Sequence, residues 1–394
     1  MIKTNLSRIK RQRQNIILSF IIAIAISFVC YLMNNCPYPY WDSLEKFCWM
    51  EYIISNTIDE KFDRSDAFFV NVSYDRDVVE YKYSNGNLTG HIDITNRETL
   101  LRFLRHVERT DYKYIFLDIR FEKGIETSYD SALFAQISKM RDISFSAHSD
   151  LQTNEKADTL KAAINDYYTT ITSTNFTRYQ FLQNGDISAP LRIYLAVDST
   201  HKPIKKFGPF YFSDGLCYNS PFMRIPEDFY KGHDYKGNQN YYDLGPVLLE
   251  MNEEDDWYYD TKDKIIIVGD YINDLHDTYR GLQPGPYLVY LAYKELVDGK
   301  HRVSWLFVCF MITIYMIISL FIINRKSLWS YIPILKKAKN KFVMFVLDLI
   351  GYSAVLVMIT IVLYLCFRTT YNIFFPSFVF SILSLVISYK FKNK

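Results

Sequence analysis

The stretch KIIIVGDYINDLHDTYRGLQPGPYLVYLAYKELVDGKHR, residues 264–302, runs without a break into VSWLFVCFMITIYMIISLFII, residues 303–323. Its first apolar run, Ile265 to Val268, closes with Gly269 and Asp270, as is typical of a strand buried on both faces of a sheet. Apolar residues recur at helical spacing after Pro286, and Gly299 is placed to end that helix. The sequence therefore predicts a central strand and a helix of a soluble fold joined directly to a membrane span.

Four apolar blocks carry the membrane signal: residues 15–33, 303–323, 342–367 and 371–389. Each is long enough to cross a hydrocarbon core, which takes about 20 helical residues. We expect four transmembrane helices, one N-terminal and three C-terminal. A cleaved signal peptide is the alternative for the first block, but Met33-Asn34-Asn35-Cys36 lacks a small-residue cleavage site, which favours an uncleaved anchor.

Basic residues gather in three short segments, residues 1–14, 324–341 and 390–394. Because short cytoplasmic flanks are enriched in Lys and Arg, we expect all three segments in the cytoplasm and residues 34–302 outside it. The net charge of +2 then belongs to membrane flanks and indicates no nucleic-acid partner. These patterns predict a multi-pass protein of the inner (cytoplasmic) membrane of a bacterial envelope, in contact with the lipid bilayer.

The N-terminal half of the outer segment alternates strand and helix patterns. Strands are expected at residues 67–72, 114–117 and 143–147. The capping-box spacing Thr95-Asn96-Arg97-Glu98 predicts the start of one helix, and Ser128 the start of another. This order implies right-handed crossovers and an α/β extracytoplasmic domain with a largely parallel sheet.

Residues 150–262 carry weaker patterns. Residues 153–166 favour a helix, and residues 191–197 and 207–212 favour strands by their apolar and β-branched content. Asn, Tyr and Pro are frequent in the remainder. We interpret this segment as the variable half of one outer domain that spans residues 34–302.

Three segments together resemble the CHASE type-2 extracellular sensory family: YKYIFLDIRFEKG (112–124), YDSALFAQISKMRDISFSA (129–147) and residues 264–300 of the opening stretch. In that family the first two give a strand ending in an aspartate and a helix beginning near a second aspartate, which correspond here to Asp118 and Asp130. The third gives a strand ending in glycine, an acidic loop and a Pro-Gly step into the last helix, matched here by Gly269, Asp277 and Pro284-Gly285. The resemblance covers nearly the whole chain and implies an outer sensory domain followed by membrane helices.

The chain departs from the family pattern at two places. HIDITNRE, residues 91–98, replaces the Trp-Pro-Arg step that commonly precedes the first helix of the family. Relatives often continue past the last span into a cytoplasmic effector domain, whereas only residues 390–394 follow the last apolar block here. We therefore expect the effector to be a separate cytoplasmic or membrane protein.

Acidic residues follow two of the expected strands, where ligands of doubly wound sheets bind. The candidate ligand-binding residues are Asp118, Asp270, Asp274, His276 and Asp277. Their carboxylates are suited to a divalent cation such as Ca²⁺ or Mg²⁺, although short acidic side chains also cap helices and fix turns. The alternatives stay open, and so does the identity of any metal.

Cys36 and Cys48 lie outside the membrane blocks and are candidates for a disulfide in an oxidising compartment, with unpaired thiols as the alternative. No nucleophile elbow, phosphate-binding loop or zinc-protease motif occurs in the sequence, so we expect no enzymatic activity and no cofactor. The leading hypothesis is a membrane-bound sensor of an unknown small ligand that signals to a separate partner. A homodimer is one arrangement compatible with this hypothesis. The alternative is a structural or scaffolding subunit of an envelope complex.

Overall fold

The structure, a computed structural model, describes residues 2–35, 63–82, 88–148, 157, 160, 162–166, 175–226, 240–250, 261–324, 341–367 and 373–392. The chain divides into two compact units. The membrane unit comprises residues 1–47, 206–221 and 300–394. The sheet unit comprises residues 48–205 and 222–299. The proposed disulfide partners Cys36 and Cys48 lie outside the described residues.

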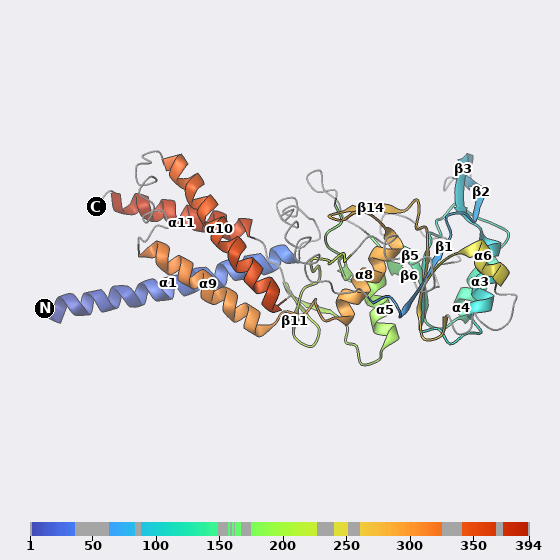
Figure 1. Ribbon diagram of the computed structural model, residues 1–394, viewed down its shortest axis with the longest axis horizontal. Coiled ribbons are helices and arrows are strands. Elements are labelled where there is room, and N and C mark those ends of the chain that lie inside the picture. Colours follow the sequence, from blue (N-terminus) through green and yellow to red (C-terminus); the bar gives the residue numbers. More distant parts are fainter. Residues whose placement is uncertain are drawn as a thin grey trace. The chain divides into compact units, whose positions relative to one another are not determined.

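The membrane unit contains the helices α1 (Ile2–Asn34), α9 (Trp305–Ile323), α10 (Lys341–Phe367) and α11 (Phe374–Lys392) (Figure 1). Among the described residues, three segments are long and apolar enough to cross a membrane: Ile9–Asn34, Trp305–Ile323 and Phe342–Phe367. The fourth apolar block is also helical, but its apolar part, Phe374–Ile387, is shorter. The chain is a membrane protein by these helices, as the sequence predicts.

Polar groups link the helices of the membrane unit. Asn15 of α1 donates a hydrogen bond to Asn324, just after α9, at 2.9 Å. The Ser384 hydroxyl of α11 donates to Asp348 Oδ2 of α10 at 2.6 Å, and Asp348 is only 4% exposed. A hydrogen bond inside an apolar bundle has little competition from water, so it fixes the pairing of α10 with α11.

The sheet unit is built on a six-stranded, fully parallel sheet with the order β12-β1-β13-β4-β5-β6. Its strands are β1 (Ala67–Asn71), β4 (Tyr114–Asp118), β5 (Ile143–Ala147), β6 (Ala162–Ile164), β12 (Tyr241–Asp243) and β13 (Ile265–Gly269). β13 lies between β1 and β4, which confirms that Ile265–Val268 forms a central strand. The largely parallel α/β sheet predicted from the sequence is thereby confirmed.

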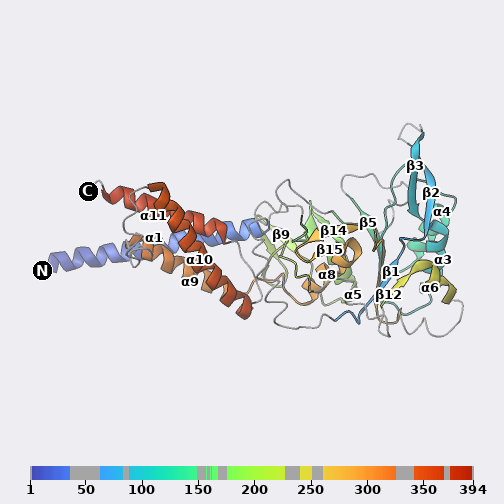
Figure 2. The same ribbon diagram turned by 45° about the horizontal axis from the view of Figure 1, so that its top comes forward.

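Helices cover both faces of this sheet (Figure 1). One face carries α3 (Arg97–Val107), α4 (Asp130–Lys139) and α6 (Leu244–Glu250), and the other carries α5 (Ala189–Val197) and α8 (Gly285–Val297), as Figure 2 also shows. Phe68 packs with the first group, whereas its neighbour Phe69 makes edge contacts with Tyr287 and Tyr290 of α8. Burial on both faces explains why β1, β4 and β13 are continuous apolar runs.

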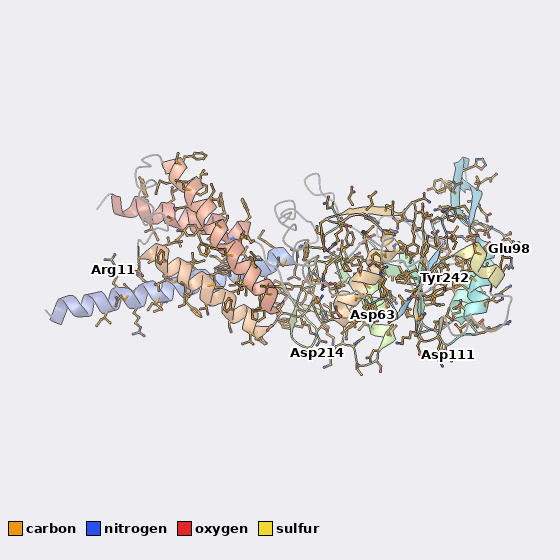
Figure 3. All side chains as sticks on the ribbon, viewed as in Figure 1. Arg11, Asp63, Glu98, Asp111, Asp214 and Tyr242 are labelled. Carbon is orange, nitrogen blue, oxygen red and sulfur yellow. The ribbon has the colours of Figure 1, made fainter. Side chains whose placement is uncertain are left out.

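At the edge of the sheet, aromatic side chains cover the joint between β12 and β1. Tyr242, labelled in Figure 3, stacks on Phe68 with the ring centroids 4.8 Å apart. Tyr241 packs edge-on against Tyr271, with a centroid distance of 5.5 Å. These contacts attach a three-residue edge strand, which has few ladder hydrogen bonds of its own.

Two secondary-structure predictions in the second half of the chain are wrong. Residues 191–197 belong to the helix α5, because Pro190 occupies its first turn and Ala189, Leu191, Ile193 and Tyr194 are buried on it. Residues 162–164 form the strand β6, where a helix over 153–166 was expected, because they pair with β5. Most of that expected helix lies outside the described residues.

Local starts and turns also differ from the predictions. Asn96 caps α3, accepting a hydrogen bond from the Thr99 backbone at 2.7 Å, because Thr95 ends a strand. Helix α4 begins at Asp130, two residues later than predicted from Ser128. One strand was expected over residues 207–212, but the chain turns back there. β9 (Lys205–Phe207) and β10 (Phe210–Phe212) form a hairpin, and β11 (Leu216–Cys217) completes its small sheet.

Three further hairpins gave no recognisable period in the sequence. They are β2 (Arg76–Lys82) with β3 (Leu88–Thr95), β7 (Leu182–Gln183) with β8 (Asp186–Ile187), and β14 (Leu275–Thr278) with β15 (Gly281–Pro284). The β14–β15 hairpin replaces the loop expected between β13 and α8. It matters for the site because it folds the acidic segment back toward the start of α8.

Candidate functional site

The carboxyl ends of β1, β13 and β4 meet at one edge of the sheet. Asn71, Gly269 and Asp118 are in register across these strands. The next residues along the chain therefore leave the sheet together, as the sequence argument for Asp118 and Asp270 assumed. The crevice at such an edge is where open α/β sheets hold ligands.

A cavity of about 580 Å³ lies at this edge, within the sheet unit. Its wall combines apolar side chains from α8 and from the loops after β4 with charged side chains of both signs. Four of the five candidate residues, Asp118, Asp270, Asp274 and His276, line it. The other charged or titratable side chains of the wall are Arg76, Asp93, Arg97, Arg120, Glu122, His148, Asp166 and Tyr179.

Asp118 ends β4 at the floor of the cavity. The Asn165 side-chain amide donates a hydrogen bond to its Oδ1 at 2.9 Å, and Tyr179 donates in turn to the Asn165 oxygen. Asp118 Oδ2 is buried and receives no hydrogen bond of standard geometry from the residues that the structure describes, although the Ser146 hydroxyl lies close enough to favour its charge. Oδ2 of Asp118 is thus a buried acceptor that the described residues do not satisfy with a hydrogen bond of standard geometry.

This environment changes the acidity of Asp118. Burial, and then the nearby charge of Asp274, raise the pKa of Asp118 to about 7, while Ser146, Asn165 and His276 oppose the shift. Burial also raises the pKa of Tyr179 well above its ordinary value, helped by the charges of Asp118 and Asp166. Tyr179 therefore stays a hydrogen-bond donor, and Asp118 changes its charge near neutral pH.

Asp274 and His276 reach the cavity from the turn before β14 and from β14 itself. His276 Nε2 lies 3.3 Å from Asp274 Oδ1, and the backbone carbonyl of Asp274 accepts a hydrogen bond from Gly285 at 2.8 Å. A Cβ on Gly285 would come within 2.2 Å of Asp274 Oδ2 and 3.1 Å of His276 Nε2. Glycine at the start of α8 is therefore what allows this pair to approach the helix.

Asp270 has a different role from Asp118. Its carboxylate accepts hydrogen bonds from the backbone amides of Ile272 at 3.0 Å and Asn273 at 2.8 Å, and from the side chains of Ser73, Asn273 and Arg76. Burial alone would raise the pKa of Asp270, but the hydrogen bonds from Ser73 and Asn273 lower it below its ordinary value. Asp270 is thus an ionised turn and ion-pair residue that joins β13, β2 and the segment after β1.

Asp277 does not join the other candidates. It is exposed on β14 and does not line the cavity. Side chains alternate along a strand, so Asp277 and its neighbour His276 point to opposite sides. The backbone carbonyl of Asp277 accepts a hydrogen bond from the Phe176 amide at 2.6 Å. Asp277 thus helps to hold β14 beside Phe176.

Arg97, Asn165 and Tyr179 also line the cavity and were not among the residues anticipated from the sequence. Arg97 is 2% exposed; it donates to the Arg120 carbonyl at 3.0 Å, lies 3.8 Å from Asp130 Oδ1 and covers the Phe121 ring. Burial lowers the pKa of Arg97 to about 10 against the opposing charges of Asp130 and Asp77. Asn165 lies within residues 153–166, for which a helix was expected, and Tyr179 comes from a segment without clear periodicity, so neither was placed at the cavity.

The described side chains contain no group of three or more His, Cys, Asp or Glu arranged to hold a metal ion. The Asp270 oxygens face N–H and O–H donors, which compete with a cation for the same lone pairs. The arrangement at Asp118 favours a hydrogen-bond donor over a fully coordinated cation. Comparisons with protein-family models, with curated proteins and with solved structures found no match to this chain.

Proposed function

We propose that the protein is a membrane-bound sensor whose extracytoplasmic sheet unit binds a small polar ligand in the cavity at the carboxyl edge of its sheet. The signal passes through the membrane helices to a separate cytoplasmic or membrane effector. This is the role that the resemblance to the CHASE type-2 family also implies. The single observation that carries the proposal is the buried Asp118 carboxylate on the floor of a 580 Å³ cavity.

The chemistry of the cavity limits the ligand. A donor group on the ligand, such as an amine or hydroxyl, would satisfy Asp118 Oδ2, which lacks a full donor among the described residues. Leu288 and Val289 of α8 and Ile119 after β4 offer apolar contacts beside it. A small polar molecule with one apolar side therefore fits the wall better than a bare metal ion does.

The connection to the membrane supports signalling through the chain. The first turn of α8 borders the cavity, through Gly285, Leu288 and Val289. Only residues 298–304 separate the end of α8 from the start of α9, which is one of the three long apolar helices. A ligand that prefers one position of α8 would act on α9 by the difference of its affinity between two states.

The proposal includes a topology in which both termini lie in the cytoplasm. The inner membrane is crossed by residues 15–33, 303–323, 342–367 and 371–389. A reporter that is active only in the cytoplasm should work when fused after Lys394 and fail when inserted near Asn238. The opposite pattern would place the sheet unit in the cytoplasm and remove an outer sensor.

The ligand-binding step can be tested on the full-length protein in detergent. Compounds that carry an amine or hydroxyl beside a short apolar group are screened by thermal shift against the unchanged protein at pH 8. Each hit is then titrated against Asp118→Asn and against Asp186→Asn, whose carboxylate is exposed on β8. We expect weaker binding for Asp118→Asn alone. Hits that bind all three proteins equally would show that the cavity at Asp118 is not the binding site.

Signalling is tested at the link between α8 and α9. Four glycine or serine residues inserted after Gly299 should leave ligand binding and membrane insertion intact but abolish regulation of the effector, once pull-down of the extracted complex has identified it. Regulation that persists with the flexible insert would instead favour the scaffolding role, in which the outer unit recruits partners without ligand-driven signalling.

A further inference from the structure

A small β-sheet belongs to the membrane unit although its residues come from the middle of the chain. Its order is β11-β10-β9, and residues 206–221 group with the membrane helices. β9 and β10 are joined by Gly208 and Pro209 alone. Gly208 has φ +56°, which suits the first central position of a tight hairpin turn.

Hydrogen bonds fix this sheet to the end of α1. The Tyr31 hydroxyl donates to the Cys217 carbonyl at 2.9 Å and accepts from the Tyr211 amide at 2.9 Å. The Asn219 amide donates to Asn35 Oδ1 at 2.6 Å. The sheet is therefore attached to the last turn of α1 and to Asn35, the residue that follows it.

The same sheet is attached to the beginning of α9. The Val303 amide donates to the Leu216 carbonyl at 2.8 Å, and the Tyr218 amide donates to the His301 carbonyl at 2.7 Å. Trp305, the first residue of α9, is 70% exposed. The sheet thus lies where both helices reach the same side of the membrane.

One face of the hairpin is apolar. Phe207 and Phe210 flank the two-residue turn, so they lie opposite each other and point to the same side, and Phe212 joins them two residues on. The Phe210 ring lies 5.7 Å from that of Phe28. Phe28 is six residues before the end of the apolar segment Ile9–Asn34, which is about 9 Å along the helix.

The opposite face of the hairpin is not apolar throughout. Lys206 is exposed, and its ammonium lies 5.8 Å from the centre of the Tyr211 ring. On the apolar face Phe207 is 79% exposed and Phe212 41% exposed. The apolar face therefore continues from a membrane helix outward and is left uncovered at its tip by the described part of the chain.

We propose that this hairpin is a lipid-contacting wedge, in which Phe207 enters the boundary of headgroups and acyl chains at the Asn34 end of α1 and Lys206 faces the lipid phosphates. The membrane is the occupant because the uncovered phenylalanine continues the surface of a lipid-facing helix, and aromatic and cationic side chains favour the interfacial layer. The wedge holds residues 206–221 of the membrane unit at the membrane surface. It does not depend on the proposed sensing role.

Photo-crosslinking tests the wedge in the full-length protein. Phe207 is replaced by the photoreactive residue p-benzoylphenylalanine, and the protein is embedded in nanodiscs of labelled phosphatidylcholine and phosphatidylglycerol. The matched control carries the same residue at Tyr74, an aromatic position that is 71% exposed in the sheet unit. We expect a severalfold higher yield of lipid adduct at position 207 than at position 74.

Three results would overturn the proposal: equal lipid labelling at both positions, a cross-link from position 207 to another part of the same chain, or a cross-link to a second protein. Each would show that something other than lipid covers Phe207. Phe207→Asp gives an independent measurement, since a charge at this position should raise the accessibility of the hairpin to a water-soluble probe in nanodiscs. Unchanged accessibility would contradict insertion, and size-exclusion chromatography of the nanodisc complex confirms that the variant is folded.

Discussion

Asp118 and Asp270 stand at the carboxyl ends of neighbouring strands, yet their surroundings are opposite. Asp118 accepts one hydrogen bond of standard geometry from Asn165, and burial raises its pKa to about 7. Asp270 accepts hydrogen bonds from two backbone amides and from Ser73, Asn273 and Arg76, and its pKa is lowered despite burial. Burial and the charge of Asp274 raise the pKa of Asp118, whereas hydrogen-bond donors outweigh burial at Asp270, so the same place at a strand end gives opposite shifts.

The two carboxylates therefore have different roles: Asp270 holds the fold together, and Asp118 is available to a ligand. Asp270 already uses its oxygens to join β13 to Ser73, after β1, and to Arg76 of β2, so removing it should damage the fold. Asp118 has one oxygen without a hydrogen bond of standard geometry among the described residues. Removing its charge should therefore change ligand binding and the pH dependence of stability while sparing the fold. In the sequence the two residues look alike, because each is an acidic residue at the end of a strand.

The largest loss of stability is expected for Asp270→Ala. The substitution leaves two backbone amides and the Arg76 guanidinium without this acceptor, at a cost of about 3 kcal/mol in the free energy of unfolding. Denaturant unfolding of the full-length protein in detergent measures it. Asp277→Ala, at an exposed position, is the control and should change stability by less than about 0.5 kcal/mol.

A smaller loss is expected for Gly269→Ala, beside Asp270. Its Cβ would come within 2.4 Å of Pro286 Cγ and 3.1 Å of Asp118 Cβ, and a proline ring cannot rotate away, so overpacking costs about 2 kcal/mol. In Gly285→Ala the obstacle is the carboxylate of Asp274, which is 44% exposed and can turn aside. Unfolding measurements that rank Gly285→Ala as the more damaging change would contradict this account of the two glycines.

Asp118→Asn is expected to cause no loss of stability, and its effect depends on pH. A raised folded-state pKa means that the folded protein keeps a proton that the unfolded chain loses, so stability falls as pH rises from about 4 to about 7. The neutral amide removes this cost. The variant should match the unchanged protein near pH 4 and exceed it by up to about 4 kcal/mol at pH 8, since each unit of the raised pKa is worth about 1.4 kcal/mol. Unfolding curves at the two pH values measure the difference. Parallel pH profiles for both proteins would show that Asp118 is not the titrating group.

The sequence predicted the parts of this fold whose signal is local. The runs that became β1, β4 and β13 are apolar because both faces of the sheet are covered, and Pro286 and Gly299 mark the limits of α8. The same reasoning placed Asp118 and Asp270 at one edge. It failed for α5, whose β-branched and aromatic residues suit a strand as well as a helix, until packing against the sheet decides.

The rest of the cavity depends on contacts between distant segments. Asn165 meets Asp118 across 47 residues, and Tyr179 reaches the site from a loop without periodicity. Arg97 occupies the first turn of a helix, where an exposed basic residue is the ordinary expectation, but the Phe121 ring and Asp130 enclose it. Asp277 was grouped with the site because it is close in sequence, and strand alternation turns it away.

The comparison of Asp118 with Asp270 is tested most directly by infrared difference spectroscopy of the protonated carboxyl stretch as pH is raised, on the full-length protein and its Asp118→Asn and Asp270→Asn variants. We expect a carboxyl band that disappears near pH 7, persists in Asp270→Asn and is missing in Asp118→Asn. A band near neutral pH that survives in Asp118→Asn and is lost in Asp270→Asn would contradict it.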